Sequence, residues 1–274
     1  MLPVAASPAT TRYYVALGDS VAAGEGLQNL APPDPCHRST LAYPALLAAN
    51  PSFVPAGTPT RSVACTGATT GDVLSRSETV NGTTVPSQLS QIAKLPLGTV
   101  TLTVGVDDLR WVNRLTTCLT QGYLACKAMS TKVLAGITKV KAKIATIVTD
   151  LRGRGARRVI VTGYYDAFPS TAVPLTGGPC GTIYATAINN ALANGTVALI
   201  RSWESHLNKS LSAAATGHGA IFVSLRSAIP TGHRICTSAE WLFPLTTNAI
   251  ARGAAMHPNT AGQASIAAHI AASA

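Results

Sequence analysis

The chain has 274 residues, of which 47% are hydrophobic and 12% are charged, and its formal net charge is +10. This hydrophobic content is enough for a sizeable core, and no apolar run reaches the roughly 18 residues of a membrane-spanning helix. The sequence contains no linker, low-complexity tract or repeat. Length and composition thus exclude a transmembrane helix and a two-domain chain, and we expect one domain over residues 11–274 behind a short tail, residues 1–10.

Short apolar runs alternate with stretches of helical periodicity along the chain. Strands are predicted at residues 13–17, 61–64, 99–104, 157–162 and 220–225. Helices are predicted at residues 40–50, 86–94, 130–152 and 184–212, and from residue 260 onward. Alternation of this kind predicts an α/β fold in which a parallel five-stranded sheet is covered by helices on both faces.

The first predicted strand ends at the triplet Gly18-Asp19-Ser20. Enzymes with α/β folds present functional side chains at the C-terminal edge of a parallel sheet, where ligands bind. At average composition the triplet occurs by chance in roughly one chain in ten of this length, so alone it is a weak signal. Ser20 is nevertheless the first candidate for a catalytic nucleophile.

A candidate base, His257, lies near the C-terminus in the segment MHPNTAGQ, residues 256–263. Thr260 and Gln263 fit a capping box, so we expect His257 to precede a helix. A serine hydroxyl needs an adjacent base, and imidazole titrates near neutrality. A structural or surface role is the ordinary alternative for a histidine. The sequence predicts that Ser20 and His257 form a pair.

Two internal blocks, CTGATT at residues 65–70 and GVDD at 105–108, complete a set of motifs with these two segments. With all four, the chain resembles the SGNH (GDSL-type) hydrolases, in particular their secreted actinobacterial lipase and esterase branch. The resemblance implies a flavodoxin-like three-layer α/β/α fold and an acyl-enzyme mechanism in which Ser20 attacks and His257 is the base. It also implies an oxyanion hole formed by the N–H groups of Ser20 and Gly67 and the side chain of residue 107.

Position 107 departs from the family pattern, because this chain has Asp107 where the family has asparagine. An ionised carboxylate cannot donate a hydrogen bond, and its charge opposes a developing oxyanion. Asp107 must therefore be protonated, turned away or replaced in its role by backbone N–H groups. Close approach of Asp108 would favour protonation, since two neighbouring carboxylates resist ionising together.

A second departure lies three residues before the histidine, where the family usually has an aspartate and this chain has Ala254. We expect the main-chain carbonyl of Ala254 to accept from the imidazole of His257 and fix its tautomer without supplying charge. A distant acid, Asp34 or Asp166, is the alternative. No local motif favours either acid.

Six cysteines form an even set without the paired short spacings of a zinc site. They predict disulfides and an oxidising compartment, whereas the alternative is free buried thiols in a cytosolic protein. Six cysteines allow 15 connectivities. The resemblance implies the pairs Cys36–Cys65, Cys118–Cys126 and Cys180–Cys236. We predict no metal and, because the glycine clusters fit no phosphate-binding loop, no nucleotide or other cofactor.

The positive net charge favours acidic partners, and the functional interpretation is attraction to an anionic lipid surface. A solubilising surface is the simpler alternative. No nucleic-acid motif or interleaved aromatic residues accompany the basic residues, so we expect no nucleic-acid partner. We expect a secreted monomer whose signal peptide has been removed, because the first residues resemble a mature N-terminus.

The motifs favour hydrolysis of carboxylic esters, with lipid or other acyl esters as substrates. Trp111, just after the third block, could line an acyl pocket or pack in the core. Transfer of the acyl group to an alcohol is an alternative within the same chemistry. A non-catalytic binding protein on a decayed hydrolase scaffold is the alternative of a different class, and Asp107 and Ala254 are the residues that favour it.

Overall fold

A parallel sheet forms the centre of the computed structural model, which describes residues 11–27 and 34–274. The expected N-terminal tail, residues 1–10, lies outside these ranges. The five strands stand in the order β2-β1-β5-β6-β7, and every neighbouring pair is parallel. Their bounds are Tyr13–Gly18 for β1, Thr60–Ser62 for β2, Leu97–Thr103 for β5, Arg158–Thr162 for β6 and Ile221–Val223 for β7. The predicted α/β class and parallel sheet are confirmed.

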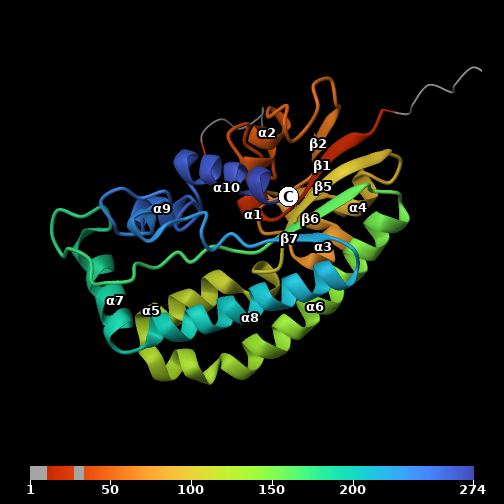
Figure 1. Ribbon diagram of the computed structural model, residues 1–274. Helices are drawn as coiled ribbons and strands as arrows, with labels where there is room; N and C mark the ends of the chain where they lie inside the picture. The colour runs from red at the N-terminus through yellow and green to blue at the C-terminus, as the bar shows by residue number, and fades with distance from the viewer. Residues whose placement is uncertain (1–10, 28–33) are drawn as a thin grey trace, which may run out of the picture.

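Helices cover both faces of the sheet, so the fold has three layers with the sheet in the middle (Figure 1). Tyr14 and Ala16 of β1 pack in one apolar core, and Val15 and Leu17 pack in the other, as the two-residue period of a strand requires. The first core is shared with α1 (Ser20–Ala23), α2 (Tyr43–Ala48) and α10 (Thr260–Ser273). The second is shared with α3 (Thr70–Leu74), α4 (Gln88–Gln91), α6 (Ser130–Gly153) and α8 (Thr196–Gly217).

Further elements lie beyond the C-terminal ends of the strands, on the left in Figure 1. They are α5 (Trp111–Ala128), α7 (Gly181–Ala193) and α9 (Thr247–Ala251). Smaller elements are the antiparallel hairpin of β3 (Glu78–Val80) and β4 (Thr83–Val85) and the 3-10 turns η1 (Asp107–Leu109) and η2 (Thr231–His233). These helices surround the space beyond the C-terminal edge of the sheet, and a cavity lies between them.

The predicted helix over residues 184–212 is in fact two helices. Gly195 adopts a left-handed conformation with φ of +83°, which ends the regular hydrogen bonding of α7 and lets α8 leave in a new direction. Asn194 ends α7, and its side chain accepts from the N–H of Thr196 at 3.0 Å. A Gly preceded by Asn is a C-terminal stop signal that the hydrophobic period alone did not reveal.

Three disulfides join Cys36 to Cys65, Cys118 to Cys126 and Cys180 to Cys236, which is the pairing that the resemblance implied. The second lies within α5, where residues eight apart on a straight helix would be about 12 Å apart. Their Cα atoms are 4.5 Å apart, because Gly122 between them leaves the helical conformation with φ of +79° and ψ of −170°.

Candidate active site

Ser20 is presented at the end of β1 by a tight strand-to-helix turn. Gly18 has φ of +146°, and a side chain there would collide with the carbonyl oxygen of Thr103, so the turn requires glycine. Asp19 caps α1 by accepting from the N–H of Val21 at 3.0 Å. Ser20 is therefore the first residue of α1, it is 8% exposed, and its hydroxyl opens into a cavity.

His257 is held by a strap that leads into α10. The N–H of Phe243 donates to the carbonyl of His257 at 2.8 Å, and the hydroxyl of Tyr165 donates to the carbonyl of Met256 at 2.9 Å. These bonds fix the backbone on both sides of the imidazole, so the ring position is defined by packed elements.

The capping box predicted for α10 is wrong. Asn259 caps the helix by accepting from the N–H of Gly262 at 3.1 Å. Gln263 instead accepts from the N–H of Tyr43 at 2.8 Å and donates to the carbonyl of Val21 at 3.0 Å. Gln263 thereby ties α10 to the helices that follow Ser20.

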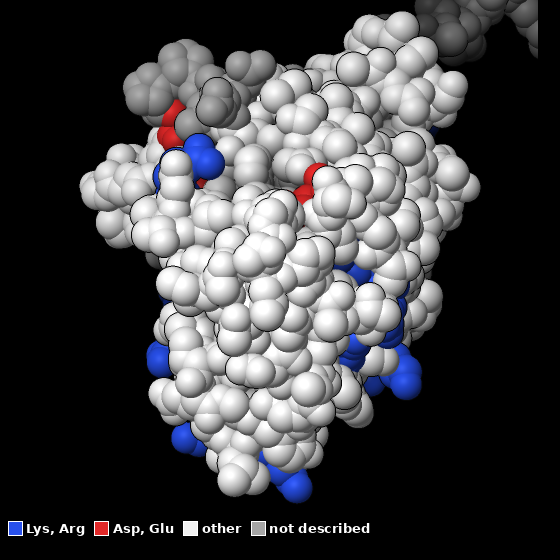
Figure 2. Space-filling view, turned by 90° about the vertical axis from the view of Figure 1, so that its left-hand side faces the viewer, with Lys and Arg blue, Asp and Glu red and all other residues white. Residues whose placement is uncertain are grey.

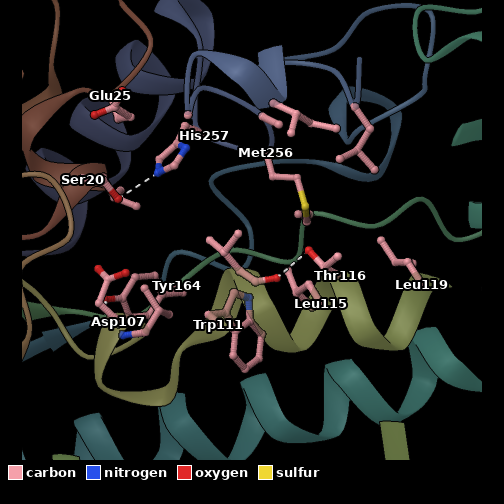
Figure 3. Close-up of a pocket in the computed structure, with 18 of the residues that line it drawn as sticks. Ser20, Glu25, Asp107, Trp111, Leu115, Thr116, Leu119, Tyr164, Met256 and His257 are labelled. Atoms are coloured by element: carbon pink, nitrogen blue, oxygen red, sulfur yellow. Dashed lines mark hydrogen bonds between the residues drawn. The ribbon is translucent and has the colours of Figure 1, made fainter. Parts of the chain in front are cut away.

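The two candidate residues meet: Nε2 of His257 lies 2.8 Å from Oγ of Ser20 (Figure 3). Burial lowers the pKa of His257, and the charge of Glu25 opposes this by raising it. The ring is therefore neutral at neutral pH. With the proton on Nδ1, Nε2 is free to accept from the serine hydroxyl, which is the arrangement of a nucleophile and its general base.

The carbonyl of Ala254 makes no ring hydrogen bond of good geometry, but together with the carbonyls of Ala255 and Gly253 it raises the pKa of His257. The Ala254 carbonyl accepts from the main-chain N–H of His257 at 3.0 Å, because the strap forms a turn there. Nδ1 is buried and has no hydrogen-bond partner among the described residues. Neither distant acid serves, since Asp34 pairs with Arg38 and Asp166 with Arg201 and Arg234.

Glu25 is the acid that sequence reasoning missed. Its side chain is buried, lines the same cavity as His257 and lies beside it in Figure 3. Oε2 of Glu25 accepts from Nδ1 of His37 at 2.8 Å, and Nε2 of His37 in turn accepts from the side-chain amide of Asn81 at 2.8 Å. The β3–β4 hairpin thus holds Glu25 in place through His37. The only sequence signal was the position of Glu25 five residues after Ser20.

Three candidate groups for an oxyanion hole line the cavity: Ser20, Gly67 and Asp107. Gly67 has φ of +78° in a turn where the N–H of Ala68 donates to the carbonyl of Cys65. No acceptor for the N–H of Gly67 is found in residues 11–27 and 34–274. The N–H of Ser20 opens a helix and so has no intrahelical partner. Two backbone donors are thus available near the serine.

Asp107 carries a buried oxygen, Oδ2, without a hydrogen-bond partner in the described chain. Burial raises its pKa to about 7, and the charges of Asp108 and then Asp72 add to this. Asp108 does not share the cavity, because its carboxylate accepts from the N–H of Thr70 at 2.7 Å and lies 3.4 Å from Nζ of Lys143. Asp107 is therefore neutral in a large fraction of molecules at neutral pH.

A second buried carboxyl, that of Asp19, lies close enough to Asp107 for the two charges to interact. Its pKa is raised well above the ordinary value by burial and by the charge of Asp107. The hydroxyl of Tyr164 donates to Asp19 and accepts from the N–H of Val106 at 3.3 Å. Tyr164, which no sequence motif singled out, thus connects the serine turn to the turn that carries Asp107.

The cavity has a volume of about 630 Å³ and extends from Ser20 and His257 along α5 (Figure 3). Trp111, Leu115 and Leu119 of α5 form one side, so Trp111 does line the pocket; it also packs edge to face against Trp203, with ring centroids 6.5 Å apart. The other apolar lining residues come from α7, α8 and the segments beside α9, and include Ile183, Ile188, Leu207, Leu245 and Met256. An apolar channel that ends at a serine suits an acyl chain.

Among the described residues, a single group of three side chains is close enough together to hold a metal ion. This group is Cys180, Cys236 and Glu240, and its two cysteines are joined in a disulfide, so they are not free to bind a metal. In the same part of the chain, no helix combines the length and apolarity needed to cross a bilayer.

The sequence model of the GDSL-like lipase/acylhydrolase family matches residues 16–264, and the chain belongs to this family. Its relatives include Lipase 1 of Streptomyces coelicolor, 30% identical over 94% of this chain and 85% of the relative. Lipase 2 of the same organism is 32% identical over 97% of this chain and 86% of the relative. The chain is a carboxylic ester hydrolase of the SGNH type.

Solved structures of two relatives have the same fold. An extracellular lipase from Streptomyces rimosus aligns with a TM-score of 0.74 and 27% identity, covering 96% of this chain and 100% of that one. A phospholipase A1 from Streptomyces albidoflavus aligns with a TM-score of 0.64 and 27% identity, covering 97% of this chain and 100% of that one.

Proposed function

We propose that the protein is a secreted, monomeric serine esterase that cleaves acyl esters through an acyl-enzyme on Ser20. The observation that carries the proposal is the 2.8 Å contact between Oγ of Ser20 and Nε2 of a His257 whose pKa is lowered by burial. His257 takes the hydroxyl proton as Ser20 attacks the ester carbon and returns it to the leaving alcohol. It then takes a proton from the water that attacks the acyl-enzyme and returns that proton to Oγ of Ser20 as the acid leaves.

The oxyanion formed in each attack needs donors within hydrogen-bond reach. The N–H groups of Ser20 and Gly67 supply two. The third is the side chain of Asp107, whose raised pKa allows it to act as a neutral acid that donates an O–H. This replaces the asparagine amide of related enzymes by a donor that exists only while Asp107 is protonated.

Lipid acyl esters are the proposed substrate class. The apolar cavity of about 630 Å³ beside Ser20 has room for an acyl chain of several carbons. The relatives named lipase and the one named phospholipase A1 support the same substrate class. The three disulfides and the extracellular lipase among the structural relatives support secretion.

A chain-length series of p-nitrophenyl esters tests the proposal. We expect turnover by the unaltered protein and a loss of several orders of magnitude in Ser20→Ala and in His257→Ala. Addition of glycerol as acceptor separates hydrolysis from transfer, because ester product in excess of free acid would make the enzyme an acyltransferase. Retention of most turnover in His257→Ala would remove His257 as the base, and absence of turnover at every chain length would favour a binding protein.

A further inference from the structure

The mouth of the cavity is surrounded by exposed apolar side chains from different elements. Ile183 of α7 is 80% exposed, Val112 of α5 is 66% exposed and Ile250 of α9 is 46% exposed, yet all three line the cavity. A residue that is both exposed and part of the lining stands at the opening. Leu124 of α5 and Leu175, in the loop that leads into α7, are also exposed; they belong to the same helix as Val112 and to the segment before the helix of Ile183, and neither lines the cavity. We call these five residues the mouth face.

Charge is distributed unevenly over the same elements. Residues 167–200, which include α7, contain no charged residue, and residues 241–274, which include α9, contain only Arg252. Between Asp108 and Asp150 the chain has basic residues but no acidic one. Figure 2 looks onto this side of the molecule: most of it is white, acidic side chains show only in small areas, and Lys and Arg side chains lie mostly along the lower and right-hand margins, with one further group at the upper left beside an acidic side chain.

The apolar centre and cationic margin of this face favour one of three possible partners: another protein, a second copy of the chain or a lipid surface. A protein that covered the mouth would block the cavity. A second copy of the chain would bring another net charge of +10 to a face whose elements α5, α7 and α9 carry no acidic residue. A lipid surface neither blocks the cavity nor repels the face. Its anionic headgroups attract the Lys and Arg side chains, and its acyl region accepts the apolar side chains.

We propose that the mouth face docks on the surface of anionic phospholipid bilayers, so that an acyl chain enters the cavity directly from the lipid. The inference rests on the function proposed above and adds its partner surface. Val112, Ile183 and Ile250 enter the boundary between headgroups and acyl chains. Phosphate oxygens bind to Arg252, which is exposed and lines the cavity, and to exposed Lys127 in the last turn of the helix that carries Val112. The substrate then reaches Ser20 without crossing water.

Vesicle sedimentation of the Ser20→Ala protein tests docking without lipid turnover. The vesicles are phosphatidylcholine alone or an equimolar mixture with phosphatidylglycerol. We expect binding to the mixed vesicles that weakens with added salt, and much weaker binding to phosphatidylcholine. In the same background, Val112→Thr with Ile183→Thr should lower the partition coefficient by at least about tenfold.

Ile221 provides the matched control, because it is an exposed isoleucine at the start of edge strand β7, away from the mouth. Ile221→Thr should bind as the parent does. Leu124→Thr with Leu175→Thr is a second pair outside the cavity lining, and it should weaken binding in the same direction without disturbing the fold. Equal losses in the Ile221 and mouth-face variants would overturn the proposal, as would unchanged binding in both mouth-face pairs or a mouth-face variant that dissociates a dimer. Turnover of a soluble short-chain ester by the active protein separately reports the proposed esterase function.

Discussion

Asp107 makes the proposed oxyanion hole sensitive to pH. A neutral carboxyl donates a hydrogen bond, whereas the ionised form repels negative charge, and the pKa of Asp107 of about 7 places this change near neutral pH. His257 has a lowered pKa, so the base is already neutral when Asp107 begins to ionise. We therefore expect activity to rise at acid pH, reach a maximum and fall as the pH passes through about 7.

Asp107→Asn tests this, because an amide donates at every pH. The substitution should remove the alkaline limb of the kcat/KM profile and raise turnover at alkaline pH by up to about 10²–10³-fold. Asp108→Asn should keep the limb but move it to lower pH, since the charge of Asp108 raises the pKa of Asp107. An asparagine variant slower than the parent at all pH values would show that Asp107 works as a carboxylate.

Glu25 supplies negative charge near an imidazole that has no aspartate of its own. Its charge raises the pKa of His257 and should stabilise the imidazolium formed during attack. In Glu25→Gln, we expect the acid limb of the kcat/KM profile to move to lower pH by up to about one unit, and kcat above that limb to fall by up to about tenfold. Asp150→Asn, which alters an exposed pair with Arg154, is the control and should change neither. An unmoved acid limb would assign Glu25 a purely structural role.

The sequence predicted the Ser20–His257 pair because each lies at an element boundary with a recognisable pattern. Glu25 and Tyr164 could not be predicted, since their roles arise from contacts between segments far apart in the chain, such as the bond from Tyr164 to Asp19. The carbonyl of Ala254 was expected to support His257; it raises the pKa of the ring, but its hydrogen bond of good geometry is to the main-chain N–H of His257.

Helix α5 was not predicted, although its apolar residues follow the helical period as closely as those of α6 do, because threonine and glycine favour helices weakly. Its threonines satisfy their hydroxyls on the helix itself, as when Thr116 donates to the carbonyl of Val112 at 3.0 Å. Gly122 interrupts it in a conformation that is essentially confined to glycine. The sequence therefore resembles a loop, although packing and a disulfide make it a helix with a kink.

Gly122→Ala should lower the free energy of unfolding by about 1–3 kcal/mol. A side chain there would meet no atom within 4 Å, so the cost is one of backbone conformation alone. Gly153→Ala, in the last turn of α6 with equally open surroundings, is the control and should be neutral or stabilising. Urea unfolding with the disulfides intact measures both. Equal stability of the Gly122 variant and the parent would mean that α5 adopts another kink.

The whole fold followed from the sequence more readily than the site did. Alternation of apolar strands and amphipathic helices determined the layers, and all five predicted strands are present. The enclosure of the C-terminal edge by α5, α7 and α9 was not predicted. Helix α9 is short, α5 is kinked and α7 has no charged residues, so their sequences do not show which part of the sheet they cover.

Buried and half-buried carboxyls should make the protein more stable at mildly acid than at alkaline pH. Burial raises the pKa of Glu204 and of Glu240 to about 7, as it does for Asp107. The folded state therefore binds more protons than the unfolded state between about pH 4.5 and 7, and stability falls as the pH rises through this window. The thermal midpoint should be higher at pH 5 than at pH 8, and Glu204→Gln should reduce the difference. A midpoint that rises over this range would contradict these pKa shifts.

Covalent labelling with a fluorophosphonate tests the central claim, that Ser20 is a nucleophile activated by His257. Intact-mass measurement should show one adduct on the unaltered protein, located at Ser20 by peptide mapping. Labelling should be absent in Ser20→Ala and several orders of magnitude slower in His257→Ala. An unlabelled native protein, or an adduct that persists in Ser20→Ala, would contradict the account.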